Sequence, residues 1–252
     1  AAISISISAP ASTLGSFIYE LVSVKDEKLD AAQKSLKYLT LAKLQMRNNQ
    51  WDQALKSLDL CFGFDPEFRN YVYSYKGMNK RQQGSPVAAK AEFEKVDSKK
   101  LPRNDSRRMR YELANIEFAA KSYRRAYKHF KFIERRWRSK PEYPGVLWHL
   151  AEIEILRRRK WRACRYVRKL YNRFPNHELT KDWEIDLGKV KFNGRTTKCV
   201  ATLSDQKKRI RRMQWNGFAD RAKAEITSLK MNEKLSQFYR DQLEAEYLVN
   251  EG

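Results

Sequence analysis

The chain has 252 residues, enough for one large domain or two small ones with a buried core. Hydrophobic residues make up 42% and only 9 Gly and 7 Pro occur, which excludes a disordered tail and disfavours a turn-rich all-β fold. The formal net charge of +22 predicts attraction to polyanions such as nucleic acid, anionic lipid headgroups or acidic cell-wall polymers. A basic, solvated surface without such a partner is the alternative.

The N-terminal region, residues 1–30, is predicted to be a partly helical extension. Its first 14 residues, in which Ile alternates with Ser, do not form a signal peptide. The start at Ala1 instead of Met fits either the mature end left by a cleaved signal or an arbitrary starting point. No apolar run approaches the roughly 18–20 residues that a bilayer-spanning helix needs.

A pattern of small and large apolar residues recurs over residues 31–175. In its first copy two apolar stripes at helical spacing are separated by Asn48 and Asn49 and closed by Pro66, which predicts two short antiparallel helices. The matching alanines of the second helices are Ala54, Ala89, Ala126 and Ala163, with spacings of 35, 37 and 37 residues. Four copies at near-constant spacing predict a stack of helix pairs.

These residues resemble the tetratricopeptide-repeat family, which places an aromatic, a Leu and a small residue on the first helix. Its second helix carries Ala, then an aromatic or Leu, then a small residue, and a Pro closes the unit. The matching residues of the first copy are Tyr38, Leu41, Ala42, Ala54, Leu58, Cys61 and Pro66. The resemblance implies an all-α fold, a right-handed superhelical solenoid of antiparallel helix pairs.

The same resemblance implies a non-catalytic scaffold that binds a protein or peptide partner in a concave groove lined by the first helices. Residues of those helices that miss the core stripe are the predicted groove residues. They are Lys43, Met46, Arg47, Arg81, Asn115 and Phe118.

After Pro175 the repeat register is lost. Residues 176–204 are predicted to be an irregular helix and linker, with a helix from Leu179 to Val190. Residues 205–252 are predicted to form further helical repeats, with a turn at Gly217. Because Gly252 stands at the turn position of a unit, we expect either a fragment of a longer protein or a capping helix at the end.

The stretch from Arg209 to Ile226 resembles, more weakly, a unit of the helical superhelix of soluble lytic transglycosylases. That resemblance implies the N-terminal domain of an exported enzyme that contacts peptidoglycan. The catalytic Glu of that family is followed by Ser, and no Glu of this chain is. We therefore expect a periplasmic or exported location and no catalytic domain within this chain.

No motif indicates catalysis, a cofactor or a metal. The chain has no phosphate-binding P-loop, no His-Glu-x-x-His and no Cys-x-x-Cys, and its three His are scattered. Three cysteines leave one disulfide pair open. Cys164 lies close to Arg162 and Arg168, which could make it a reactive thiolate, but its place in the fourth repeat favours a small packed residue.

Basic residues form a patch late in the chain. Residues 157–173 contain nine Lys or Arg and no acid, with Trp161, Tyr166 and Tyr171 between them. Cations interleaved with aromatics are typical of nucleic-acid grooves, so RNA or DNA is a third alternative partner. However, Trp161 and Tyr171 fall on or beside the apolar stripe, so we expect them in the core. The predicted patch comprises Arg157, Arg158, Arg159, Arg162, Arg165, Lys207, Lys208 and Arg211.

Overall fold

The computed structural model describes residues 11–180, 189–192, 195–199, 201–230 and 237–249. The chain divides into two compact units, Ala1–Ala126 and Tyr127–Gly252, and each is described by itself. Within the described ranges, no helix is both long enough and apolar enough to cross a membrane.

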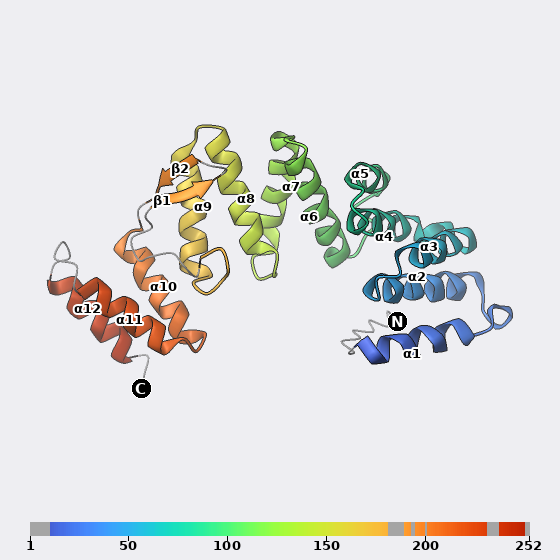
Figure 1. Cartoon of the computed structure of the whole chain (residues 1–252), viewed down its shortest axis with the longest axis horizontal. Coiled ribbons are helices and arrows are strands. Elements are labelled where there is room, and N and C mark those ends of the chain that lie inside the picture. Colours follow the sequence, from blue (N-terminus) through green and yellow to red (C-terminus); the bar gives the residue numbers. More distant parts are fainter. Residues whose placement is uncertain (1–10, 181–188, 193–194, 200, 231–236, 250–252) are drawn as a thin grey trace. The chain divides into compact units, whose positions relative to one another are not determined.

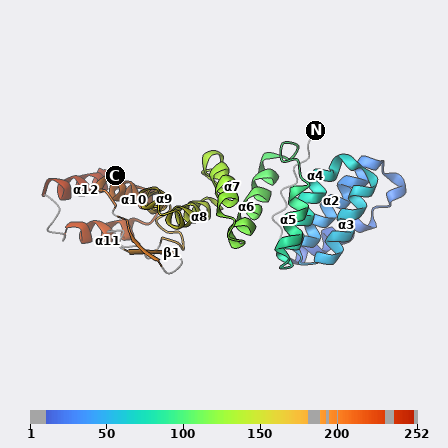
Figure 2. The ribbon, with the colours of Figure 1, turned by 90° about the horizontal axis from the view of Figure 1, so that it is seen from above.

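Unit 1 is built from helices that pair in antiparallel fashion (Figures 1 and 2). Helix α2 packs on α3, α4 packs on α5, and α6 follows against both α4 and α5. Its elements are α1 (Ala11–Ser23), α2 (Ala31–Arg47), α3 (Trp51–Phe64), α4 (Arg69–Gln82), α5 (Pro86–Glu94), α6 (Arg103–Ala119), the start of α7 (Tyr123–Arg136), and the short 3₁₀ helices Asp26–Lys28 and Pro66–Phe68.

Local signals fix where these helices begin and pack. Asp30 caps α2, because its carboxylate accepts from the Gln33 amide at 2.8 Å while the Gln33 side chain accepts from the Asp30 amide at 3.0 Å. Ala54, Leu58 and Cys61 on α3 are fully buried against α2 and α4. Gly77 on α4 lies directly against the Phe93 ring on α5, where a Cβ would stand 2.5 Å from a ring carbon. The core of unit 1 is therefore packed tightly between its helix pairs.

Unit 2 contains the remainder of α7, two further helix pairs, a β-hairpin and a final helix (Figure 1). Helix α8 packs on α9, α9 on α10, and α10 on α11. The elements are α8 (Tyr143–Leu156), α9 (Lys160–Arg173), β1 (Lys189–Phe192), β2 (Arg195–Lys198), α10 (Leu203–Trp215), α11 (Ala219–Lys230) and α12 (Gln237–Val249).

A left-handed residue stands in the turn of each helix pair from α2–α3 to α10–α11 within the described residues. Positive φ values occur at Asn49, Gly84, Lys121, Arg158 and Gly217, close to +58° for the non-glycine residues and +78° for the two glycines. Each of these residues lies five positions before a fully buried alanine of the next helix, namely Ala54, Ala89, Ala126, Ala163 and Ala222. The same turn and the same buried alanine thus recur together, and the predicted all-helical repeat fold is confirmed.

An internal ion pair joins three helices of unit 2. The Arg209 side chain on α10 is fully buried, and its Nε and Nη2 donate to the Glu225 carboxylate on α11 at 3.0 to 3.2 Å. Its Nη1 donates to the Tyr171 carbonyl oxygen on α9 at 3.2 Å. A buried charge that is fully paired in this way holds the surrounding helices in one arrangement.

The structure corrects two predictions in the region after the fourth repeat. A helix was expected from Leu179 to Val190, but Thr180 lies in a turn and Val190 lies in β1, which pairs antiparallel with β2. Residues 181–188 lie outside the described part of the chain. Cys164 is neither a reactive thiol nor a simple packing residue, because it forms a disulfide with Cys199. Burial raises the pKa of the free Cys61 thiol to about 11, so this residue stays protonated.

Candidate functional site

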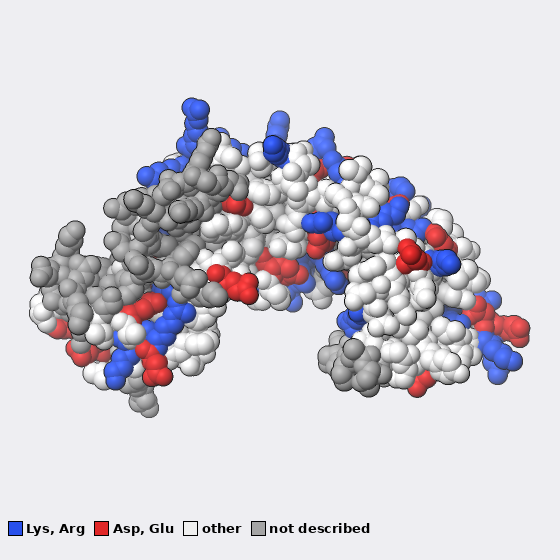
Figure 3. Space-filling model, in the orientation of Figure 1, with Lys and Arg blue, Asp and Glu red and all other residues white. Residues whose placement is uncertain are grey.

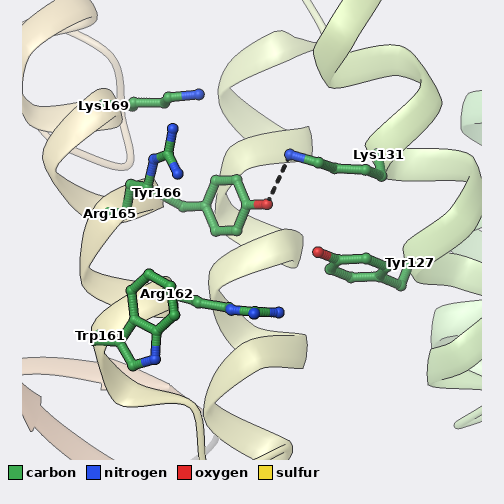
Figure 4. A pocket seen from close by; sticks show the side chains of 7 residues that line it. All are labelled: Tyr127, Lys131, Trp161, Arg162, Arg165, Tyr166 and Lys169. Carbon is green, nitrogen blue, oxygen red and sulfur yellow. Dashed lines mark hydrogen bonds between the residues drawn. The ribbon is translucent and has the colours of Figure 1, made fainter.

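A pocket of about 220 Å³ lies between α7 and α9 in unit 2 (Figure 4). We name it the α7–α9 pocket. Helix α7 contributes Tyr127 and Lys131, and α9 contributes Trp161, Arg162, Arg165, Tyr166 and Lys169.

The position of Ala163 explains which side chains of α9 face the pocket. Ala163, Val167 and Leu170 are fully buried on one face of the helix. Trp161 and Arg165 lie two residues before and after Ala163, which places each about 200° around the helix from it. The Trp161 side chain is accordingly 65% exposed, so the prediction that it belongs to the core is wrong. Tyr171 is fully buried, as predicted.

The two lysines of the pocket share one buried carboxylate. Lys131 Nζ lies 2.9 Å from Glu134 Oε2 and donates to the Tyr166 hydroxyl at 3.1 Å, and Lys169 Nζ lies 2.6 Å from Glu134 Oε1 (Figure 4 shows the Lys131–Tyr166 bond). Burial raises the pKa of Glu134, but the two ammonium groups outweigh it and hold the pKa below its usual value. Glu134 therefore stays ionised and offsets part of the positive charge of the lysines.

The two arginines of the pocket carry its uncompensated charge. Neither Arg162 nor Arg165 forms an ion pair with any other residue that the structure describes. The Arg162 guanidinium is half-buried and lies 5.0 Å from the centroid of the Trp161 ring, whose side chain is exposed. Guanidinium groups bind carboxylates and phosphates through paired hydrogen bonds, so these two side chains make the pocket a candidate anion site.

The tyrosines supply neutral hydrogen-bond groups. Burial, then the neighbouring Tyr166 hydroxyl, raises the pKa of Tyr127, and burial raises the pKa of Tyr166. Both hydroxyls therefore keep their protons at neutral pH. The Arg157 guanidinium covers the Tyr127 ring at 4.5 Å. The side chains that line the pocket suit the binding of an anion next to an aromatic ring. They include no pair of a nucleophile and a general base.

A second pocket of about 330 Å³ continues this surface along α7. It shares Tyr127 and Lys131 with the α7–α9 pocket and adds Lys128, Phe132, Arg135 and Arg136. The Arg136 guanidinium lies 4.3 Å from the Phe132 ring centroid. The cationic, aromatic character of the site is therefore not confined to α9. Within the described ranges, no group of three or more His, Cys, Asp or Glu is placed to hold a metal ion.

The predicted basic patch falls into three groups. Arg162 and Arg165 line the α7–α9 pocket and Arg157 covers its Tyr127, whereas Arg158 and Arg159 are exposed in the turn before α9. Lys207, Lys208 and Arg211 lie on α10 and do not line the pocket.

Sequence reasoning missed the contribution of α7 to the pocket. Lys131 and Tyr166 are 35 residues apart, and so are Glu134 and Lys169. This separation is two residues shorter than the 37 residues between Ala126 and Ala163, so pairing residues of successive second helices near the repeat spacing would have found both contacts.

The predicted groove residues lie on α2, α4 and α6 of unit 1. Several make contacts within the chain. Lys43 Nζ lies 4.9 Å from the Tyr75 ring centroid, and burial lowers its pKa. Arg81 Nε is 3.8 Å from a Glu112 carboxylate oxygen, and Phe118 packs edge-on against Tyr123 at 5.5 Å between ring centroids.

The remaining predicted groove residues are Met46, Arg47 and Asn115. Met46 packs on the core of unit 1. Arg47 and Asn115 lie on α2 and α6, and binding in this groove stays a prediction.

The recurring left-handed turn and buried alanine decide the type of fold. It is a tetratricopeptide-like helical repeat. No family model matches the sequence, and no curated protein sequence matches it. Solved structures similar to the chain include PilW, described as a widely conserved type IV pilus biogenesis factor, with a TM-score of 0.49, 14% identity, and coverage of 92% of this chain and 90% of that one.

Two other solved structures are similar at the same level. The pilF protein of Pseudomonas aeruginosa has a TM-score of 0.45 and 18% identity, over 86% of this chain and 99% of that one. A tetratricopeptide repeat protein from Parabacteroides merdae has a TM-score of 0.44 and 13% identity, over 94% of this chain and 78% of that one. These likenesses concern the fold and say nothing of what the chain binds.

Proposed function

We propose that the chain is a helical-repeat scaffold that binds an acidic segment of a partner protein in the α7–α9 pocket. The observation that carries the proposal is the placement of Arg162 and Arg165, without ion-pair partners among the described residues, beside the exposed Trp161 ring. Exposed arginine and tryptophan side chains are the residues most enriched at energetically important positions of protein interfaces.

The chemistry of the pocket indicates the kind of segment. A Glu or Asp carboxylate would accept paired hydrogen bonds from a guanidinium group, and an adjacent aromatic or aliphatic side chain would pack on Trp161. The pocket volume of about 220 Å³ suits one or two side chains. An acidic segment with interspersed apolar residues therefore matches the site in charge, size and polarity.

Three alternatives are less well supported. The predicted groove of unit 1 offers fewer open charges, because Arg81 faces Glu112 and Lys43 is partly desolvated over Tyr75. Non-specific nucleic-acid grooves stack successive bases on successive aromatic rings. In the α7–α9 pocket Trp161 is exposed, but Tyr166 is buried and Arg157 covers the Tyr127 ring. Peptidoglycan binding rests on a short resemblance and on charge, and no feature of the α7–α9 pocket favours it over a peptide.

The test is fluorescence anisotropy with a labelled 12-residue peptide in which Glu alternates with Phe and Leu, at about 150 mM salt, where exposed charges are screened beyond about 8 Å. We expect Arg162→Glu/Arg165→Glu to weaken binding by at least about 100-fold, because two charge-assisted contacts become repulsive. Trp161→Ala is expected to weaken binding by about tenfold through lost packing.

The matched control is Lys99→Glu/Lys100→Glu, which makes the same change in net charge at two exposed residues of unit 1. Equal losses in the two double variants would mean that the net charge alone attracts the peptide, and the proposal would fail. Tighter binding of a 12-nucleotide RNA, lost in the pocket variant, would instead assign the pocket to nucleic acid.

A further inference from the structure

The outward face of α10 combines cations with one large aromatic. Lys208, Arg211, Arg212 and Trp215 are all exposed and follow the spacing i, i+3, i+4, i+7, so they share one side of the helix. The opposite side is buried through Ile210 and Met213, which pack with Ala222 and Ile226 of α11. The fold of the helix pair therefore depends on the buried face of α10, whereas Lys208, Arg212 and Trp215 are exposed on the other face.

A second exposed aromatic stands in the turn that follows. Gly217, with φ of +78°, closes α10, and the Phe218 amide donates to the Met213 carbonyl oxygen at 2.9 Å. The Trp215 side chain is 77% exposed and the Phe218 side chain 44%. This turn, residues 215–218 together with the outward face of α10, is called the α10 tip below.

The aromatics of the α10 tip are not required by the turn itself. The turn between α4 and α5 has the same left-handed glycine, Gly84 with φ of +78°, but the residues at the positions of Trp215 and Phe218 are the polar Gln82 and Ser85. The repeat turn thus forms equally well without exposed rings. Two large aromatics held in water at one end of a helix pair indicate a surface that they contact.

The acids around the α10 tip are largely engaged elsewhere. Asp205 accepts from Asn172 and lies near Arg168, and Glu225 is held by the buried Arg209. Asp220, in the first turn of α11, is exposed. Lys208 and Arg212 form no ion pair with any residue in the described ranges. The tip therefore presents uncompensated positive charge next to exposed aromatic rings.

We infer that the α10 tip docks on the surface of an anionic lipid membrane. Cations attract the negative headgroups, and Trp and Phe rings partition into the boundary between headgroups and acyl chains. A turn at one end of a helix pair brings both rings to the same place, which suits a flat surface. This surface shares no residue with the α7–α9 pocket, so each proposal can fail without the other.

The test is co-sedimentation of the full chain with vesicles of 70% phosphatidylcholine and 30% phosphatidylglycerol, and with pure phosphatidylcholine vesicles, at about 150 mM salt. We expect binding to the anionic vesicles alone. Both Trp215→Ala/Phe218→Ala and Lys208→Glu/Arg212→Glu should lower the partition coefficient by at least about tenfold, the first by removing the inserted rings and the second by reversing two charges.

Each variant has a matched control. Tyr19→Ala removes another aromatic side chain that is 77% exposed. Lys99→Glu/Lys100→Glu makes the same change in net charge in unit 1, and both controls should keep the vesicle binding of the parent chain. Unchanged helical circular dichroism in all four variants would show that the fold is intact. Parent-level binding by the aromatic variant, or equal losses in the two charge variants, would overturn the inference and leave only non-specific attraction by net charge.

Discussion

Helices α3 and α9 occupy the same place in their repeats but differ in the face they turn to solvent. Both have 14 residues, and both bury the residues at corresponding positions, Ala54, Leu58 and Cys61 in α3 and Ala163, Val167 and Leu170 in α9. Helix α3 carries one Lys and two Asp, whereas α9 carries six Lys or Arg and no acid. On the face of unit 1 that Figure 3 shows, Lys and Arg are accordingly mixed with Asp and Glu.

The difference between the two helices separates the positions that the fold requires from the positions whose side chains can vary. Asp52 of α3 stands at the position of Trp161 of α9, and Lys56 at the position of Arg165, two residues on either side of the buried alanine. Because these positions do not touch the core, their side chains change without changing the helix pair. The side chains on the solvent face of such a repeat can therefore differ in chemistry without altering the fold, as those that line the α7–α9 pocket do.

The regions around α3 and α9 also differ in the interactions that stabilise them. The largest expected effect on stability comes from the ion pair between Arg209 and Glu225 beside α9. Arg209→Ala should lower the free energy of unfolding by about 3–5 kcal/mol, because it removes the buried partner of the largely buried Glu225 carboxylate and leaves it only the longer contact with Arg221 at 3.9 Å. Denaturant unfolding followed by circular dichroism would measure the change. In Arg209→Met/Glu225→Leu, where both charges are removed, much of that loss should disappear. An equally large loss in the double variant would show that packing, and not the ion pair, holds this junction.

The disulfide between Cys164 and Cys199 stabilises the α9 region, whereas Cys61 on α3 is a free thiol. Cys199→Ser should lower the unfolding free energy by about 2–4 kcal/mol, because the disulfide with Cys164 closes a 35-residue separation and restricts the unfolded chain. Thermal unfolding with and without a reducing agent provides the measurement. The parent chain should lose stability on reduction, and the variant should not respond. A parent chain insensitive to the reductant would contradict the disulfide.

The helix pair that follows α3 in unit 1, α4 and α5, depends instead on close packing between its two helices. Gly77→Ala should cost about 1–3 kcal/mol, because the new methyl group would overlap the buried Phe93 ring. Gly63→Ala on α3, where nothing lies within 4 Å of the added Cβ, is the control and should be neutral or slightly stabilising. A neutral result at Gly77 would show that Phe93 has room to move and that the contact is not limiting.

The smallest expected effect is a dependence on pH near α9. The folded-state pKa of Glu134 is depressed, so its contribution is present above the unfolded-state value of 4.5 and is lost as the pH falls through the lower folded-state pKa. The stability of Glu134→Gln should therefore fall less steeply below about pH 4.5 than that of the parent chain. Denaturant unfolding between pH 3 and 6 would compare them. Parallel curves would mean that the ion pairs with Lys131 and Lys169 contribute nothing.

Much of the repeat architecture could be predicted from the sequence, because the buried alanines recur at a spacing that only stacked helix pairs explain. The β-hairpin could not, because Val190 continues an apolar pattern that a helix and a short strand share. The disulfide was equally hidden, since Cys199 lies outside the repeat register. Trp161 was predicted to lie in the core because it is close in sequence to the apolar stripe. Its position two residues before Ala163 instead directs its side chain toward solvent.

The most direct test of the α7–α9 pocket is an NMR titration of the six tryptophan indole N–H signals with the acidic peptide. The account predicts that the Trp161 signal, assigned from Trp161→Phe, shifts the most and saturates with the same affinity that anisotropy gives. Backbone amides of Arg162 and Arg165 should shift with it. A stationary Trp161 signal, with shifts instead along α2, α4 and α6 near Lys43, Arg81 and Phe118, would contradict the account and place binding in the first-helix groove.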